Sequence, residues 1–323
     1  MKVVAVAITT DVDLHGDQIS KEALLQAKEQ IRGTSCPAVG VGHDPTVPPL
    51  GKVLSAEVRE REDGIYELLI TQEVFERSEA VILPDGTQGI KTESESDRRP
   101  FVLSEPVERT QVSVDPNSFG RRRDADRYIE AVRADAPSGS FEPKLHVRKA
   151  ILPDPELVIT LGELAAAAFV SKKLFDKISE RIGDHIAEDA AKVYDLFRAA
   201  ILKFPQYVNP RSRPLVYVIQ LPGDPLIEFV ARTADPNILL SALAMERREA
   251  SIARALDLHQ AFRTKKIQFL LSDTGEWQFN FLLTADGAVV GTEASFRRQS
   301  HRLKMLQQDS SSQTGQLSVD GSA

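Results

Sequence analysis

The first residues of this chain that could do chemistry form an acidic turn between residues 11 and 22. Acidic side chains stand at the first, third, seventh and twelfth positions and glycine at the sixth, as in a calcium loop: Asp11, Asp13, Gly16, Asp17 and Glu22. The eighth position is Gln18 where that loop has an apolar residue, and the preceding segment is predicted to be a strand where the calcium motif requires a helix. Turn and capping chemistry explains the same residues. We therefore predict no metal and no cofactor here.

A histidine, His43, follows in the segment Val41–Asp44. A histidine can act as a general base near neutral pH. The alternative is a histidine that caps a turn beside Asp44 and Pro45.

Segments of the first 119 residues resemble the phage prohead (capsid-maturation) protease superfamily. That family has a strand, an Asp-x-x-Gly-Asp turn, a helix, an apolar-x-His-Asp segment, a Pro-x-Gly followed by a strand, and a closing strand. The matching segments here are Asp13–Asp17, Leu24–Ile31, Val41–Asp44, Pro49–Val53 and Arg109–Pro116. The resemblance does not cover the second half of the chain.

The resemblance implies a fold related to herpesvirus assemblin and a serine endopeptidase in which a histidine is the general base for a serine. His43 matches the base. The nucleophile is expected in the window Lys91–Asp97, where Ser94 and Ser96 are the candidates by position. The glutamates that alternate with these serines would repel the negative charge of an oxyanion.

Two functions therefore stay open. The first is a serine endopeptidase that uses His43 with Ser94 or Ser96. The second is a non-catalytic interaction or sensor protein that keeps the protease-like fold and recognises a polypeptide. A host protein of phage origin is a variant of the second.

The composition of the chain indicates which binding partners and which cellular compartment to expect. The chain has 323 residues, a formal charge of −7 and a single cysteine, Cys36. The acidic balance gives no footprint for nucleic acid or anionic lipid, and the basic run Arg121–Arg123 is followed by acids, which indicates a solvated face. We expect a polypeptide substrate or protein partner, no membrane segment and a cytoplasmic location. No oligomeric state is predicted.

The predicted fold class is α+β. Residues 1–119 are expected to form a β-rich domain with a strand at Val3–Thr9, a helix capped by Ser20 and a hairpin around Asp63-Gly64. Residues 120–150 are expected to form a charged arm and linker, and residues 151–205 a helical segment. Residues 206–306 are predicted to be a small ββαβββ module, whose aromatic strand 277–281 packs beneath a helix over 236–262. Residues 307–323 are predicted to be disordered.

Overall fold

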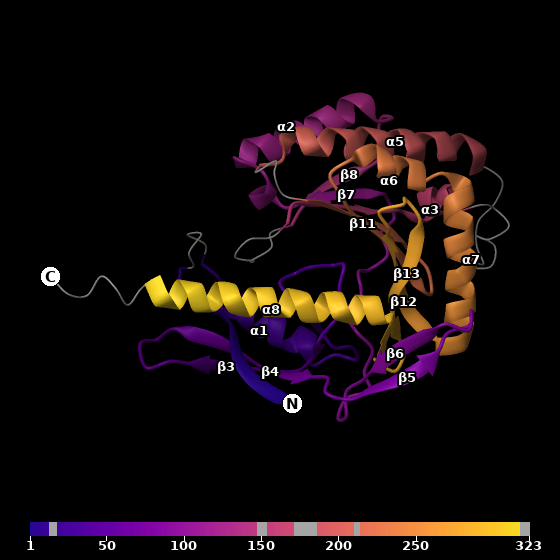
Figure 1. Cartoon of the computed structure of the whole chain (residues 1–323). Helices are drawn as coiled ribbons and strands as arrows, with labels where there is room; N and C mark the ends of the chain where they lie inside the picture. The colour runs from indigo at the N-terminus through magenta and orange to yellow at the C-terminus, as the bar shows by residue number, and fades with distance from the viewer. Residues whose placement is uncertain (13–17, 147–153, 171–185, 210–213, 317–323) are drawn as a thin grey trace. The chain divides into compact units, whose positions relative to one another are not determined.

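The computed structural model describes residues 1–12, 18–146, 154–170, 186–209 and 214–316 (Figure 1). The chain has a mixed α+β fold and divides into two compact units. Unit 1 comprises residues 1–41, 47–103 and 283–323, and unit 2 comprises residues 42–46 and 104–282.

Unit 1 is built on an antiparallel sheet covered by one helix. The strand order is β1-β4-β3-β2, and the strands are β1 (Lys2–Thr9), β2 (Ala38–Val39), β3 (Gly51–Glu60) and β4 (Tyr66–Val74). Helix α1 (Lys21–Ile31) begins at the predicted cap, because the Ser20 hydroxyl accepts the Ala23 amide at 3.2 Å. Its apolar side packs against the sheet in a core that includes Leu24, Ile31, Val53, Ala56 and Leu68. The predicted strand, helix and hairpin are confirmed.

A second strand set of unit 1 contains elements that the sequence did not indicate. Strands β5 (Ser78–Ile82) and β6 (Gln88–Thr92) form a hairpin, and β6 also pairs with β14 (Val289–Gly291). The hairpin lies in a polar window without clear periodicity, but Glu79 and Lys91 are cross-strand neighbours and form an ion pair of 3.0 Å. Strands held by ion pairs that face water need no alternation of apolar and polar residues. The hydrophobic pattern of the sequence therefore did not indicate β5 and β6.

Unit 2 is built on a mixed sheet with the order β13-β12-β11-β10-β9-β7-β8. Its strands are β7 (Gln111–Val114), β8 (Glu142–Leu145), β9 (Glu156–Thr160), β10 (Leu215–Leu221), β11 (Leu226–Thr233), β12 (Thr264–Leu271) and β13 (Trp277–Thr284). The β9–β10, β11–β12 and β7–β8 pairs are parallel, and the β10–β11 and β7–β9 pairs are antiparallel.

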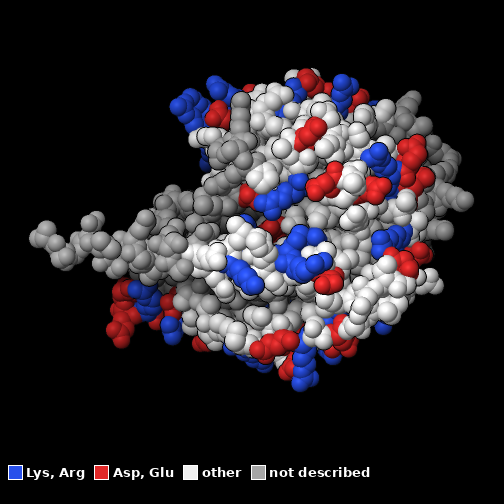
Figure 2. All heavy atoms as spheres, viewed as in Figure 1, with Lys and Arg blue, Asp and Glu red and all other residues white. Residues whose placement is uncertain are grey.

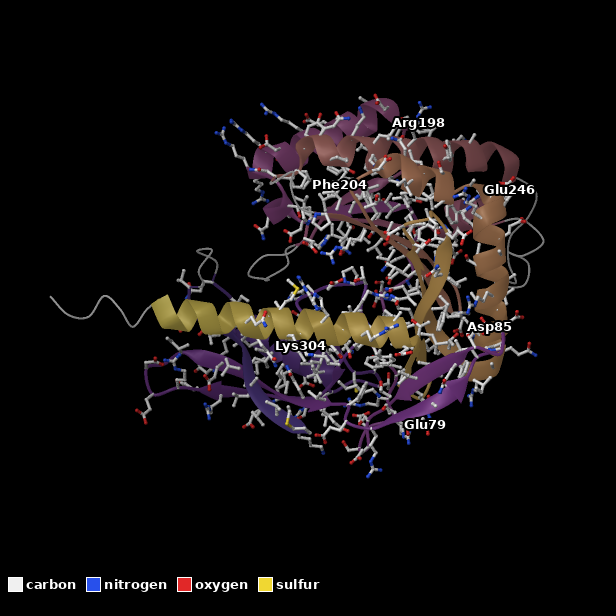
Figure 3. The ribbon with its side chains drawn as sticks, in the orientation of Figure 1. Glu79, Asp85, Arg198, Phe204, Glu246 and Lys304 are labelled. Carbon is white, nitrogen blue, oxygen red and sulfur yellow. The ribbon has the colours of Figure 1, made fainter. Side chains whose placement is uncertain are left out.

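The other described elements of unit 2 are helical. They are the 3₁₀ turn η1 (Pro116–Ser118) and the α-helices α2 (Arg122–Asp135), α3 (Glu163–Phe169), α5 (Ile186–Tyr207), α6 (Pro236–Ala242) and α7 (Met245–Phe262). Side chains of α5 separate by face, so that Phe204 lies inside the fold while Arg198 points outward (Figure 3). Trp277 donates its indole N–H to the carbonyl of Ala242 at 2.8 Å, which confirms that the aromatic strand packs on the helical segment 236–262. That segment is two helices, with a break at residues 243–244.

The division of the chain differs from the predicted domains. The predicted boundary at residue 119 lies inside unit 2, and residues 283–306 belong to unit 1 although the sequence placed them in the C-terminal module. The final helix, α8 (Glu293–Gln316), extends into the segment that was predicted to be disordered. Its start is fixed by Thr292, whose hydroxyl accepts the Ser295 amide at 3.1 Å. The predicted acidic turn at residues 13–17 lies outside the described residues.

Surface charge is mixed in sign. On the face shown in Figure 2, basic and acidic side chains are interspersed. None of the described helices is long and apolar enough to cross a bilayer.

Candidate functional site

The loop that carries His43 has an unusual backbone. Gly42 and His43 both adopt left-handed conformations, with φ of 57° and 55°. Such a conformation is uncommon for a residue with a side chain, and it persists only where surrounding contacts hold it. Asp44 supplies part of that support, because one carboxylate oxygen accepts the amide and the hydroxyl of Thr46 at 2.9 and 2.6 Å. Arg232 also lies 3.6 Å from the Asp44 carboxylate.

A row of buried polar side chains crosses the sheet of unit 2. Thr160, Gln220 and Glu228 are register partners on the neighbouring strands β9, β10 and β11. Glu228 is in turn the register partner of Gln268 on β12. The row continues to β13, where the Asn280 amide donates to the Gln268 side-chain oxygen at 2.6 Å. Gln268 and Asn280 are almost inaccessible to water, with exposures of 0% and 1%.

The end of this row anchors the His43 loop. The side-chain amide of Gln268 donates to the carbonyl of Pro45 at 2.9 Å, and that of Asn280 donates to the carbonyl of Thr46 at 2.9 Å. Both carbonyls lie within three residues of His43, whose side chain is exposed. The polar row therefore fixes the backbone that presents this histidine.

Glu228 gives the row its charge. Its carboxylate forms an ion pair with Lys266 at 2.7 Å and accepts hydrogen bonds from the amides of Gln268 at 2.5 Å and Gln220 at 3.1 Å. Burial alone would raise the pKa of Glu228, but the Lys266 ammonium and these hydrogen bonds outweigh it and hold the pKa below its usual value. The group stays ionised and fully partnered inside the sheet.

Sequence reasoning missed this row. Part of its signal was present, since Gln220 and Glu228 interrupt apolar runs in β10 and β11, and Asn280 stands between two phenylalanines of β13. A single polar residue in an apolar strand does not predict such a row, because its hydrogen-bond partners lie on strands that are distant in the sequence.

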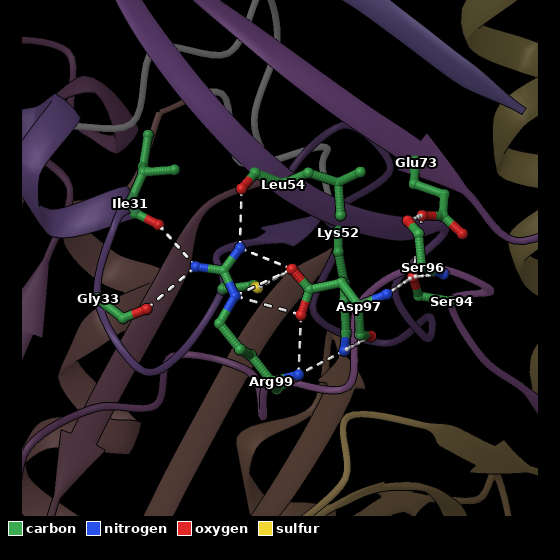
Figure 4. Close-up of polar contacts among 10 residues, drawn as sticks. Ile31, Gly33, Lys52, Leu54, Glu73, Ser94, Ser96, Asp97 and Arg99 are labelled. Carbon is green, nitrogen blue, oxygen red and sulfur yellow. Dashed lines mark hydrogen bonds and ion pairs between the residues drawn. The ribbon is translucent and has the colours of Figure 1, made fainter.

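The predicted nucleophiles lie in unit 1 and share one carboxylate (Figure 4). The hydroxyls of Ser94 and Ser96 both donate to Glu73, the former at 2.9 Å. The Ser94 oxygen also accepts the amides of Ser96 at 3.2 Å and Asp97 at 2.8 Å. Glu73 is buried and accepts the amide of Glu95 at 2.8 Å as well. This arrangement closes a turn after β6.

The Glu73 carboxylate is a weak base in this setting. Burial would raise its pKa, but hydrogen bonds from Ser96, the Glu95 amide and Ser94 outweigh burial and lower the pKa. A general base works best with a pKa near the operating pH. Glu73 is therefore suited to hold the turn and poorly suited to activate either hydroxyl.

The same segment continues into a clamp formed by Arg99 (Figure 4). Its guanidinium donates to the carbonyls of Ile31 at 3.1 Å, Gly33 at 3.0 Å and Leu54 at 2.8 Å. It also forms an ion pair of 2.7 Å with Asp97. One side chain thus joins the end of α1 to β3 and to the serine turn.

Lys52 is buried beneath this clamp. Its ammonium donates to the carbonyls of Asp97 at 3.0 Å and Arg99 at 2.6 Å, and its burial lowers its pKa. Cys36 lies alongside with its sulfur 3.5 Å from the Asp97 carboxylate, and burial raises the pKa of the thiol. A Cβ at Gly287 would lie 2.2 Å from the backbone oxygen of Arg99 and 2.0 Å from the Lys52 ammonium, so only glycine fits there.

The predicted site residues thus fall into two groups. Ser94 and Ser96 are brought together in unit 1, whereas His43 belongs to unit 2. The catalytic pairing of His43 with either serine stays a prediction. Among the described residues, no cluster of three or more His, Cys, Asp or Glu side chains could hold a metal ion.

Comparison of the chain with known proteins found no match among family models, curated proteins or solved structures. The resemblance to prohead proteases stays an expectation from short sequence segments, and function must be argued from the geometry of the two sites.

Proposed function

We propose that this protein recognises a polypeptide without hydrolysing it, as a non-catalytic relative of the prohead proteases. The observation that carries the proposal is the set of hydrogen bonds made by the Ser94 hydroxyl. A serine hydroxyl has one proton to donate and two lone pairs that accept. In Ser94 the proton goes to Glu73 and the oxygen accepts two backbone amides.

A nucleophile needs the opposite arrangement. Its proton must pass to a base with a suitable pKa, and a lone pair must be free to attack the carbonyl carbon. Ser94 is also only 1% exposed, so a substrate would have to displace the turn to reach it. Ser96 is exposed, but its hydroxyl donates to the same carboxylate. Both groups are suited to a structural role.

A serine endopeptidase is the second candidate, and the His43 loop favours it. A left-handed histidine on a loop held by a buried polar row is the kind of conformation that concentrates at functional sites. Under this function His43 is the general base, and the serine turn must open for Ser94 or Ser96 to react.

One experiment separates the two functions. The full chain is incubated with a fluorophosphonate serine probe, and in parallel with a reduced, carboxymethylated polypeptide that cannot fold. We expect binding of the unfolded polypeptide, no cleavage of it, and no more probe labelling than in the Ser94→Ala and Ser96→Ala variants. Labelling that requires His43 and one of these serines, or cleavage of the polypeptide, would establish the peptidase. Failure to bind the polypeptide would refute the recognition proposal.

A further inference from the structure

Strand β1 is an edge strand with exposed apolar side chains. It stands at the end of the order β1-β4-β3-β2, so one of its sides has no partner strand among the described residues. Val4 is 65% exposed and Val6 is 50% exposed. Edge strands are usually protected by charges, prolines or short length. β1 has eight residues, no proline and one charged side chain, Lys2.

The register shows which backbone groups of β1 face the open side. Met1 and Val74 exchange two hydrogen bonds, from the Val74 amide at 2.9 Å and from the Met1 amine at 3.1 Å. Hydrogen-bonded and non-hydrogen-bonded pairs alternate along an antiparallel ladder. Val3 and Ala5 therefore direct their backbone groups toward β4. Lys2, Val4 and Val6 direct theirs outward, up to the irregularity between Val6 and Ile8.

We infer that the open side of β1 pairs with β1 of a second copy of this chain, antiparallel and with Val4 opposite Val4. In this register Lys2 of each copy lies opposite Val6 of the other, so the outward amides and carbonyls of all three residues find partners. The two-fold symmetry makes the contact self-complementary. It also places the two valines of each copy on one face, where they form a continuous apolar strip.

Charge supports the antiparallel arrangement. Lys2 is the only charged residue of β1, and the antiparallel register keeps the two lysines at opposite ends of the ladder. A parallel pairing in register would set Lys2 against Lys2, which is destabilising. Strand β5 is also an edge strand, but it carries the exposed, charged side chain of Glu79. β2, at the other end of the order of β1, has only two residues, and the end strand β8 carries Glu142, Pro143 and Lys144. Among these described edges, β1 is the long one without a charge along its centre.

The contact is small. The paired segment, Lys2–Val6, has five residues per copy. A standard interface has roughly 20 to 30 residues per partner. We therefore expect a concentration-dependent dimer, with a dissociation constant in the micromolar range or weaker.

Sedimentation equilibrium of the full chain tests the inference. We expect reversible dimerisation of the wild type and at least a tenfold weaker association for Val4→Lys, which sets two ammonium groups against each other across the symmetry axis. Ile82→Lys is the matched control, because Ile82 is 69% exposed on β5 and lies outside the proposed contact. A wild type that stays monomeric at millimolar concentration, a Val4→Lys variant that associates like the wild type, or an equal loss in Ile82→Lys would overturn the inference.

Hydrogen exchange of the wild type gives a second test that needs no variant. The amides of Val4 and Val6 should gain protection as concentration rises. Those of Val3 and Ala5, which bond to β4, should be protected at every concentration. Equal concentration dependence at all four amides, or none at Val4 and Val6, would exclude this pairing.

Discussion

A single guanidinium binds three backbone carbonyls from two separate segments of unit 1. Arg99 donates to carbonyls at the end of α1, in the turn that follows α1 and in β3, while its ion pair with Asp97 fixes its orientation. The fork geometry of arginine allows all of these bonds at once, and the point charge of lysine does not. The role of Arg99 is therefore specific to its shape as well as to its charge.

We predict that Arg99→Lys lowers the free energy of unfolding by about 1–3 kcal/mol, because the part-buried carbonyls of Ile31 and Leu54 lose a donor. Urea unfolding followed by circular dichroism measures the change. The neighbouring Arg98→Lys is the matched control, since Arg98 is mostly exposed and pairs with Glu93 at the surface. Its effect should stay within about 0.5 kcal/mol. Similar losses in both variants would show that the clamp contributes nothing specific.

At the scale of elements, the polar row joins five strands and a loop. The amides of Gln268 and Asn280 end the row on the backbone of residues 45 and 46. Together with the Asp44–Thr46 hydrogen bonds, these two bonds hold the backbone next to the left-handed His43. Side chains of the sheet thus anchor a loop that is distant from them in the sequence.

Asn280→Leu tests that anchorage. Leucine has a similar shape but no amide, so the Thr46 carbonyl and the Gln268 oxygen lose a donor, which costs about 1–3 kcal/mol. We expect faster hydrogen exchange at the amides of His43, Asp44, Thr46 and Val47. Asn237→Leu, at the exposed start of α6, should leave exchange in that loop unchanged. Unchanged exchange in Asn280→Leu would mean that other contacts hold the loop.

The elements that could be predicted are those with local signals. The Ser20 cap and the Asp-Gly turn at residue 64 act within a few residues, and the structure confirms the helix and hairpin they define. The β5–β6 hairpin was missed because its stabilising pairs are polar and cross-strand. Of the candidate site, the sequence indicated the serines and His43 but not Glu73, Glu228 or Asn280. These partners are joined only by tertiary pairing, which no local pattern encodes.

At the scale of the whole molecule, each unit contains a buried carboxylate whose pKa is held low. Glu73 lies in unit 1 and Glu228 in unit 2, and in both cases hydrogen bonds or an ammonium outweigh the cost of burial. A carboxyl group with a lowered pKa in the folded state contributes stability above its unfolded pKa. That contribution is lost as the pH falls through the folded value. Acid should therefore weaken both units.

We predict that the free energy of unfolding falls as the pH drops below about 4.5, the ordinary pKa of a glutamate, and that Glu228→Gln reduces this dependence. At pH 7 the variant should be less stable by about 3–5 kcal/mol, since Lys266 loses its buried partner. The gap should narrow on acidification, because the wild-type carboxylate is then neutralised as well. Urea unfolding at a series of pH values measures this convergence, with the exposed Glu62→Gln as the control that should follow the wild type. A gap between Glu228→Gln and the wild type that stays constant with pH would show that Glu228 does not titrate with unfolding, and that its role is hydrogen bonding alone.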